Sequence, residues 1–217
     1  TANAYVQPLM GRYIGSLNST LRKNGFAGRF HLMQSSGGLT APETAIAFPV
    51  RFLESGPAGG AQATAFVGGK IGHEDILSFD MGGTTAKACL IQGGQPDIAA
   101  ILEAGRVHRF KRGSGLPVRA PVIDMIEIGA GGGSIARIDS LGLLKIGPDS
   151  AGADPGPACY GLGGRAPAVT DANLLLGYLD PDYFLGGHMT LDLEAAEAAI
   201  RGVAEPLGLS LVEAAWG

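Results

Sequence analysis

The residues best suited to chemistry lie together at residues 80–85, which read DMGGTT. Asp80 ends an apolar stretch, and the two glycines that follow let the backbone turn closely against a ligand. Successive N–H groups of such a turn can hold phosphate oxygens, and a neighbouring aspartate can bind Mg²⁺ directly or through water. We therefore assign catalysis and the metal to Asp80, and phosphate binding to the turn formed by Gly82, Gly83, Thr84 and Thr85.

The same turn has a simpler interpretation. Two glycines between two strand-like segments also form an ordinary β-hairpin that binds nothing. The segment is not a Walker A loop, because the sequence contains no G-x-x-x-x-G-K-[ST]. On these residues alone, the phosphate turn and the plain hairpin both stay open.

A second candidate site lies at residues 127–134, where Glu127 precedes a glycine-rich run and a strand-like segment. Successive glycines permit close approach of a ligand, so we assign nucleotide contacts to Gly131, Gly132 and Gly133. Glu127 is the candidate catalytic base or metal residue. Asp124 does not pair with it on a regular strand, because a separation of three places the two carboxylates on opposite faces. A flexible connector is the alternative for the glycines.

Three further features carry weaker signals. The basic side chains of residues 106–112, which include His108, form either a solvated loop or a cradle for an anion. The rigid loop at residues 154–161, DPGPACYG, suits either substrate contact or a structural lid. Two cysteines are too few for a disulfide framework. Cys89 fits strand packing, whereas Cys159 lies in the Gly/Pro loop and is a candidate reactive thiol.

Composition excludes several classes of protein. The net charge is −4, which argues against a nucleic-acid surface. No apolar run reaches the length needed to cross a bilayer, and the first residues lack the pattern of a secretory signal. A chain of 217 residues with 46% hydrophobic content can bury the core of one large or two small domains. We expect a cytoplasmic protein that binds neither membranes nor nucleic acid.

Periodicity predicts the elements that position these residues. Apolar residues at helical spacing predict a helix over residues 5–21, and small residues predict another over 55–67. Residues 30–34 read as a short strand and 45–53 as a further extended segment. The remaining segments predict two hairpins, 76–80 with 86–92 and 135–139 with 143–146, and two helices, 172–179 and 192–203, the first capped by Thr170 and Asp171.

A capping-box pattern from Ser210 to Glu213 predicts a helix that starts shortly before Gly217. A globular domain rarely ends just after a helix nucleus. The sequence also begins without a methionine. We therefore expect this chain to be a segment of a longer protein.

Long segments resemble the hydantoinase A family of ATP-hydrolysing hydantoinases, 5-oxoprolinases and related carboxylase subunits. The resemblance covers most of the chain and rests on LESGPAGGA (53–61), ILSFDMGGTTAKACLI (76–91), GLPVRAPVIDMIEIGAGGGSIARID (115–139), SAGADPGPACYG (150–161) and VTDANLLLGYLDPDYFLGG (169–187). It implies an α/β, ribonuclease-H-like fold of the actin, Hsp70 and sugar-kinase type, present only in part. Residues 1–53 would end the first lobe, 54–69 would form the connecting helix, and 70–217 would belong to the second lobe.

The resemblance also implies a function. ATP with Mg²⁺ would activate the carbonyl of a small cyclic amide, a hydantoin or 5-oxoproline, for hydrolysis, together with a B-type subunit or domain in an oligomer. The family often has Asp where this sequence has Lys87, so Lys87 becomes a candidate phosphate contact. The family's other phosphate loop and its adenosine loop are missing from these residues, so we expect the isolated segment to be inactive. The alternatives are the ATP-using subunit of an acetone- or acetophenone-type carboxylase and a scaffold without catalysis.

Overall fold

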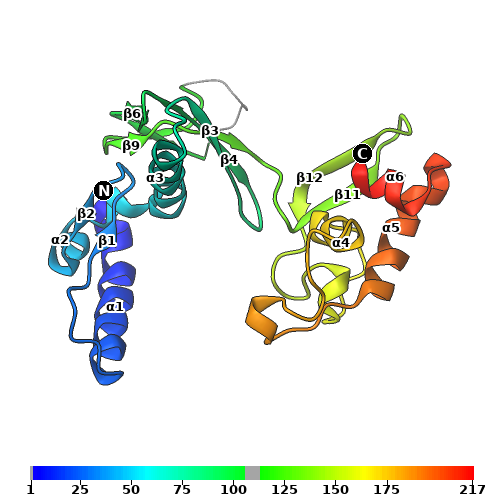
Figure 1. Cartoon of the computed structure of the whole chain (residues 1–217), viewed down its shortest axis with the longest axis horizontal. Coiled ribbons are helices and arrows are strands. Elements are labelled where there is room, and N and C mark those ends of the chain that lie inside the picture. The colour runs from blue at the N-terminus through cyan, green and yellow to red at the C-terminus, as the bar shows by residue number, and fades with distance from the viewer. Residues whose placement is uncertain (1, 106–112) are drawn as a thin grey trace. The chain divides into compact units, whose positions relative to one another are not determined.

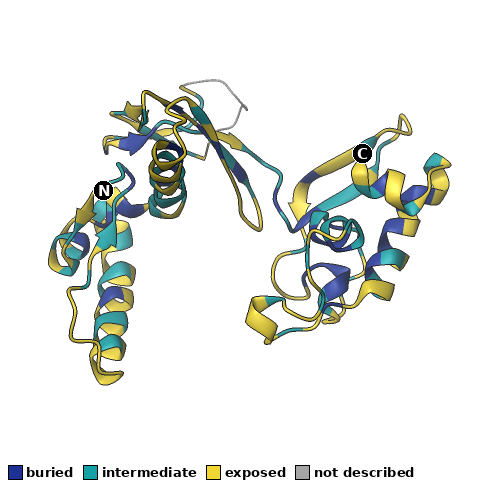
Figure 2. Ribbon diagram, viewed as in Figure 1, coloured by how far each residue is buried: buried dark blue, intermediate teal, exposed yellow. Residues whose placement is uncertain are grey.

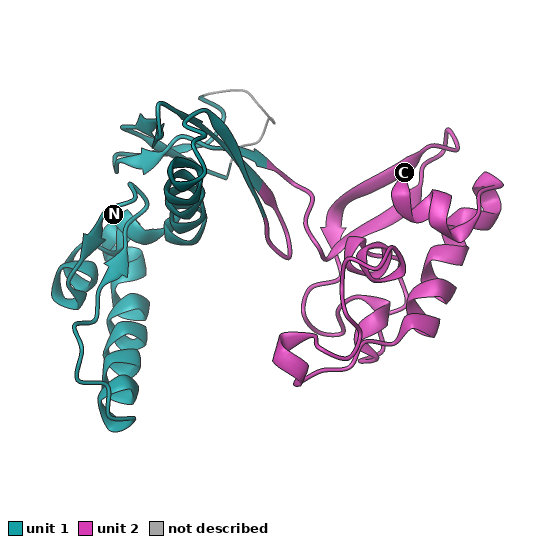
Figure 3. Ribbon diagram, viewed as in Figure 1, with its two compact units in different colours: residues 1–80, 87–127 teal, residues 81–86, 128–217 magenta. Residues whose placement is uncertain are grey.

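The computed structural model describes residues 2–105 and 113–217, coloured by residue number in Figure 1. The fold is mixed α/β and divides into two compact units. Unit 1 holds residues 1–80 and 87–127, and unit 2 holds residues 81–86 and 128–217 (Figure 3). The tip of the hairpin therefore belongs to a different unit from the strands that carry it. The expected lobe boundaries at residues 53 and 69 concern a larger fold and stay a prediction.

The first part of unit 1 is helical. Helix α1 (Ala2–Lys23) is longer than predicted and includes Pro8. Strands β1 (Leu32–Met33) and β2 (Leu39–Thr40) form a small antiparallel pair, so the strand predicted at residues 30–34 is only partly present. A core of Ile14, Ala45 and Phe52, with Leu32 of β1 packed against it, joins α1 and β1 to residues 42–52.

The prediction of an extended segment at residues 45–53 is wrong. Those residues lie in helix α2 (Pro42–Ala47) and the 3₁₀ helix η1 (Pro49–Phe52). Each helix has a proline in its first turn, where the missing N–H costs nothing and the fixed φ favours a helical start. The apolar composition suited a strand, but the two prolines decided the local structure.

A four-stranded sheet contains the two strands that flank the turn at residues 82–85. Its order is β10-β4-β3, with β5 (Gln95–Pro96) also paired to β4. Strand β3 (Ile76–Met81) pairs with β4 (Ala86–Gln92), as the sequence predicted, and β10 spans Ile126–Ile128. Two short ladders pair β6 (Ile98–Ala99) with β9 (Val122–Ile123) and β7 (Leu102–Ala104) with β8 (Leu116–Val118).

Helix α3 (Ser55–Lys70) packs in the core of unit 1 with β4. Alanines at positions 58 and 61 bring the helix close to Cys89 and Ile91 of the strand. The packing role predicted for Cys89 is confirmed, because Cys89 and Ile91 are buried while Leu90 is exposed. Figure 2 shows buried segments along this hairpin. Small residues on α3 therefore allow the helix to lie tightly against β4, the strand that follows the turn at residues 82–85.

Unit 2 joins a second hairpin to a group of helices. The hairpin of β11 (Ser134–Ile138) and β12 (Leu144–Ser150) was predicted from sequence. The helices are η2 (Ala158–Tyr160), α4 (Val169–Leu175), η3 (Leu185–Gly187), α5 (Leu193–Leu207) and α6 (Leu211–Trp216). Their core contains Cys159, Leu174 and Ala196.

Helix boundaries in unit 2 follow capping side chains where these exist. Asp192 accepts a hydrogen bond from the Ala195 N–H at 2.9 Å, and Ser210 with Glu213 completes the predicted capping box. A helix was predicted at residues 172–179 with Thr170 and Asp171 as caps, and α4 overlaps this range but begins at Val169 and ends at Leu175. The capping role of Asp171 is confirmed in part, because its carboxylate accepts the Ala168 N–H at 2.8 Å at the start of the helix. Thr170 and Asp171 both lie in the first turn of α4.

No helix among the described residues is long and apolar enough to cross a membrane.

Candidate functional site

The turn that follows β3 exposes main-chain donors. Gly82 donates its N–H to the Thr85 carbonyl oxygen at 2.9 Å, which closes the turn. In the described part of the chain, the N–H groups of Gly83, Thr84 and Thr85 make no hydrogen bond. Gly83 and Thr84 are exposed, and a Cβ on Gly83 would meet nothing within 4 Å. Three successive free donors with open space beside them suit an anion.

The glycine-rich run of residues 131–133 lies directly against this turn. Gly132 donates its N–H to the Gly82 carbonyl oxygen at 2.9 Å, and Gly133 donates to the Gly83 carbonyl oxygen at 2.7 Å. A Cβ on Gly131 would lie 2.6 Å from the Gly82 oxygen. These glycines are therefore required for the approach of one backbone to another. That role was missed from sequence, and a direct nucleotide contact stays a prediction.

Helix α4 and β11 hold the glycine run in turn. The Thr170 N–H and its hydroxyl both donate to the Gly132 carbonyl oxygen, each at 2.8 Å. Ser134 Oγ accepts the Gly131 N–H at 2.8 Å, and the Gly133 carbonyl accepts from the Ala151 N–H at 2.8 Å. Thr170 and Ser134 are both buried. The run is thus fixed by neighbours on three elements rather than acting as a flexible connector.

Asp80 lies at the end of β3 and is exposed. Among the described residues, no hydrogen bond to its carboxylate is found, so its oxygens are open to a ligand. Helix α3 passes close by, since a Cβ on Gly60 would lie 3.5 Å from Asp80 Oδ2. The described residues contain no cluster of three or more metal-ligating side chains. One carboxylate still suffices for Mg²⁺ when phosphate and water supply the other ligands.

Lys87 is already engaged by carboxylates. Its Nζ forms an ion pair with Glu54 at the start of α3 and lies 3.9 Å from Glu127 Oε1. Its side chain is only 14% exposed, and the ion pair joins β4 to the start of α3. The predicted phosphate contact of Lys87 is not tested by this arrangement, but the residue has a structural role that the sequence did not indicate.

Glu127 has a half-exposed side chain and borders a cavity of about 60 Å³ in unit 1. Strand β10, which carries it, pairs with β4. The cavity also has Lys87 and Asp124 in its lining, so its wall is rich in charge. Neither the structure nor the spacing of these groups tests the catalytic role predicted for Glu127, which stays a prediction. The basic segment with His108 lies outside the described residues.

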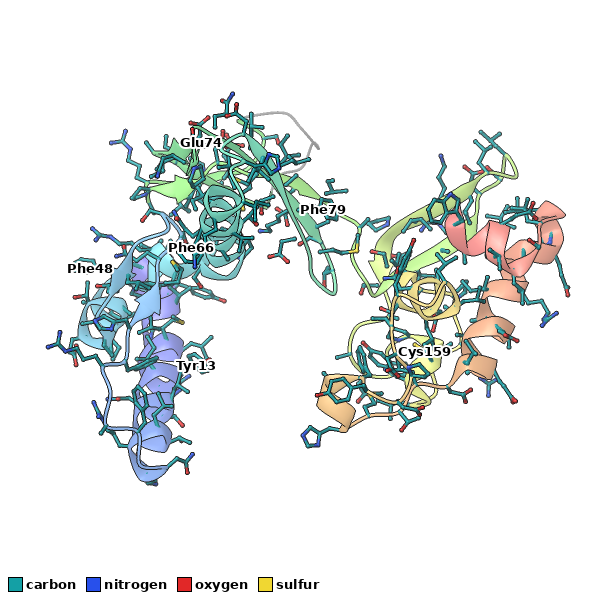
Figure 4. All side chains as sticks on the ribbon, in the orientation of Figure 1. Tyr13, Phe48, Phe66, Glu74, Phe79 and Cys159 are labelled. Carbon is teal, nitrogen blue, oxygen red and sulfur yellow. The ribbon has the colours of Figure 1, made fainter. Side chains whose placement is uncertain are left out.

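The loop at residues 154–161 is anchored by a buried carboxylate. Asp171 is fully buried and accepts the N–H groups of Cys159 and Ala168, each at 2.8 Å, and of Ala158 at 3.3 Å. Cys159 is also fully buried (Figure 4), and burial, with Asp171 beside it, raises the pKa of its thiol far above the ordinary value. The reactive-thiol interpretation is therefore wrong, because an inaccessible, protonated thiol is a poor nucleophile.

With this geometry in place, similarity to known proteins identifies the chain. A family model described as Hydantoinase/oxoprolinase matches residues 1–217. The chain belongs to the hydantoinase/oxoprolinase family. It is 46% identical to an uncharacterised protein of Methanocaldococcus jannaschii and 42% identical to the caprolactamase subunit alpha of Pseudomonas jessenii, in each case over 99% of its length.

Two solved structures of hydantoinase/oxoprolinase relatives share the fold. The crystal structure of the ATP-dependent caprolactamase from Pseudomonas jessenii matches 99% of this chain and 30% of its own chain, with 41% identity and a TM-score of 0.70. Nucleotide-free acetone carboxylase matches 93% of this chain and 27% of its own, with 31% identity and a TM-score of 0.72. The chain spans about a third of the length of its sequence relatives, 32% of the Methanocaldococcus jannaschii protein and 30% of the caprolactamase subunit alpha.

Proposed function

We propose that this chain contributes the phosphate-binding turn of an ATP-dependent enzyme that opens a cyclic amide of the hydantoin or 5-oxoproline type. The observation that carries the proposal is the set of free N–H groups at Gly83, Thr84 and Thr85 in a member of this family. A turn that only joined two strands would have no need of a glycine run packed against it. Asp80 stands directly before the turn, where a magnesium ligand would be needed.

The reaction needs an activated ring carbonyl, because an amide is a poor electrophile. Bound ATP supplies a phosphoryl group to the carbonyl oxygen, and water then adds to the ring carbon, so that ring amide, ATP and water give the ring-opened acid, ADP and phosphate. In this proposal the turn's N–H groups neutralise the phosphate oxygens, as preorganised donors do in phosphoryl transfer. Asp80 holds Mg²⁺, and Glu127 is the proposed base.

The larger assembly is part of the same proposal. An actin-type ATPase fold would supply the second half of the nucleotide cleft, and a B-type subunit or domain would complete hydrolysis in a cytoplasmic oligomer. Support comes from the name of the caprolactamase relative, which is a subunit alpha. The chain's match to only 30% of that protein also leaves room for the missing parts.

A second candidate function is the ATP-using subunit of a ketone carboxylase. The fold agrees with acetone carboxylase as well as with caprolactamase, with TM-scores of 0.72 and 0.70. The same turn would then serve the activation of a ketone. Release of ADP coupled to a cyclic amide, as opposed to a ketone with bicarbonate, separates the two activities in the full-length protein with its partner.

The test of the phosphate turn is Asp80→Asn in the full-length protein, with Glu74→Gln as the matched control. Glu74 is an exposed carboxylate of the same unit and is labelled in Figure 4. We expect Asp80→Asn to lower ATP turnover about 100-fold or more, as loss of a transition-state contact does. Glu74→Gln keeps full turnover. If Asp80→Asn retained parental turnover, the roles assigned to Asp80 and the turn would be wrong, whereas a parent protein without ATP turnover would favour the scaffold.

A further inference from the structure

We infer that Thr170 is a positioning residue for the phosphate turn, acting through Gly132. The inference rests on the proposed function, since it assigns a purpose to the turn that Thr170 steadies. Thr170 lies in the first turn of α4, and its hydrogen bonds go to Gly132 rather than to residues 82–85 of the turn. Its effect would pass through one main-chain residue only.

Gly132 is held at both of its backbone groups. Its carbonyl oxygen accepts two hydrogen bonds from Thr170, one from the N–H and one from Oγ1, both at 2.8 Å. Its N–H donates to the Gly82 carbonyl oxygen at 2.9 Å, inside the turn. A displacement of Gly132 therefore moves the turn as well.

Glycine is the residue that most needs such support. A glycine run has more backbone freedom than any other sequence and loses the most on becoming ordered. Thr170 is 8% exposed, and a Cβ on Gly132 would lie 3.0 Å from its Oγ1, so the two residues are in close contact. Two donors on one carbonyl fix the peptide more firmly than the backbone N–H would alone.

The direction of the free donors depends on this support. The N–H groups of Gly83, Thr84 and Thr85 donate no hydrogen bond in the described chain, so their orientation is set by the residues that hold Gly82 and Gly83. Donors that are already oriented bind an anion without an ordering cost. The structure thus gives Thr170 a part in nucleotide affinity rather than in folding alone.

The experiment compares Thr170→Val, which keeps the shape and removes the hydroxyl, with Thr170→Ser, which keeps the hydroxyl. Ser210→Ala serves as the control, because it removes a comparable hydroxyl contact at α6 in the same unit. Hydrogen–deuterium exchange of the Gly132 and Gly133 amides in the full-length protein without nucleotide reports the support itself. Equilibrium binding of Mg²⁺–ATP reports its consequence.

We expect Thr170→Val to raise amide exchange at Gly132 and Gly133 and to weaken Mg²⁺–ATP binding, each about five-fold, the equivalent of one hydrogen bond. Thr170→Ser restores both values, and Ser210→Ala changes neither. Parental exchange in Thr170→Val would overturn the positioning role itself. Faster amide exchange in Thr170→Val with parental Mg²⁺–ATP binding would overturn the link between Thr170 and nucleotide affinity. Failure of the proposed enzyme function is detected separately, by the ATP turnover of Asp80→Asn.

Discussion

Substitution of Gly131 by alanine tests the packing that holds the phosphate turn. The added Cβ would lie 2.6 Å from both the Gly82 oxygen and the Thr84 carbonyl carbon, and 2.7 Å from the Thr84 nitrogen. Ordinary contact begins at 3.4 Å, so roughly 0.8 Å of movement is needed, the difference between these distances. All three neighbours are main-chain atoms, so no side chain can rotate away to relieve the contact.

The cost follows from this geometry. Overpacking of a well-packed site costs about 1–3 kcal/mol, and the bonds from Gly132 and Gly133 to the turn would weaken as well, at about 1 kcal/mol each. Alanine also reduces the conformational freedom of the unfolded chain, which stabilises the folded state by about 0.4–1 kcal/mol. We expect a net loss of about 2–4 kcal/mol, which lowers the melting temperature by about 4–16 °C for a chain of this size.

Differential scanning calorimetry measures this shift, and Gly202→Ala is the matched control. Gly202 lies inside helix α5 of the same unit, and a Cβ there would meet nothing within 4 Å. The control should therefore gain about 0.5–1 kcal/mol from improved helix propensity. Equal melting temperatures for Gly131→Ala and the parent would refute the close approach of the two backbones.

Two further predictions concern titratable groups. Cys159 should resist iodoacetamide at mildly alkaline pH in the native protein and react fully after unfolding, because burial raises the pKa of its thiol. Mass spectrometry of the labelled chain measures this difference, and rapid labelling of the native protein would contradict it. The pKa of Glu213 is lowered first by the Ser210 hydroxyl and then by the Ser210 N–H. The stability that ionised Glu213 gives to the start of α6 is therefore present above the pKa of the unfolded chain, and it is lost as pH falls through the pKa of the folded chain. Ser210→Ala should move that pKa back toward the ordinary value in an NMR titration.

Local signals allowed much of the fold to be predicted. Cys89 was correctly assigned to strand packing, and the side chains of Asp192 and Ser210 marked helix starts correctly. Each of these signals depends on residues within a few positions of one another. They failed at residues 45–53, where apolar composition favoured a strand and two prolines imposed helical starts.

The candidate site was less predictable because its parts are distant in sequence. Gly131 was assigned to a ligand, since a single sequence does not tell which neighbour a glycine approaches, and here that neighbour is Gly82. The partner of Lys87 is Glu54, which also could not be inferred from spacing. Asp171 was expected to cap a helix, and it does accept the Ala168 N–H at the start of α4, but the sequence did not indicate that it is buried and also accepts the N–H groups of Ala158 and Cys159 in the preceding loop.

The packing of Gly131 and Gly133 against the hairpin also affects how this site tolerates change. Recognition between the two segments uses main-chain atoms, so a variant library would find few acceptable substitutions at these two glycines. The hydroxyl of Thr84, by contrast, takes no part in that packing. Residues without side chains are thus the least replaceable here, and distant members of the family are better sought by glycine spacing than by polar residues.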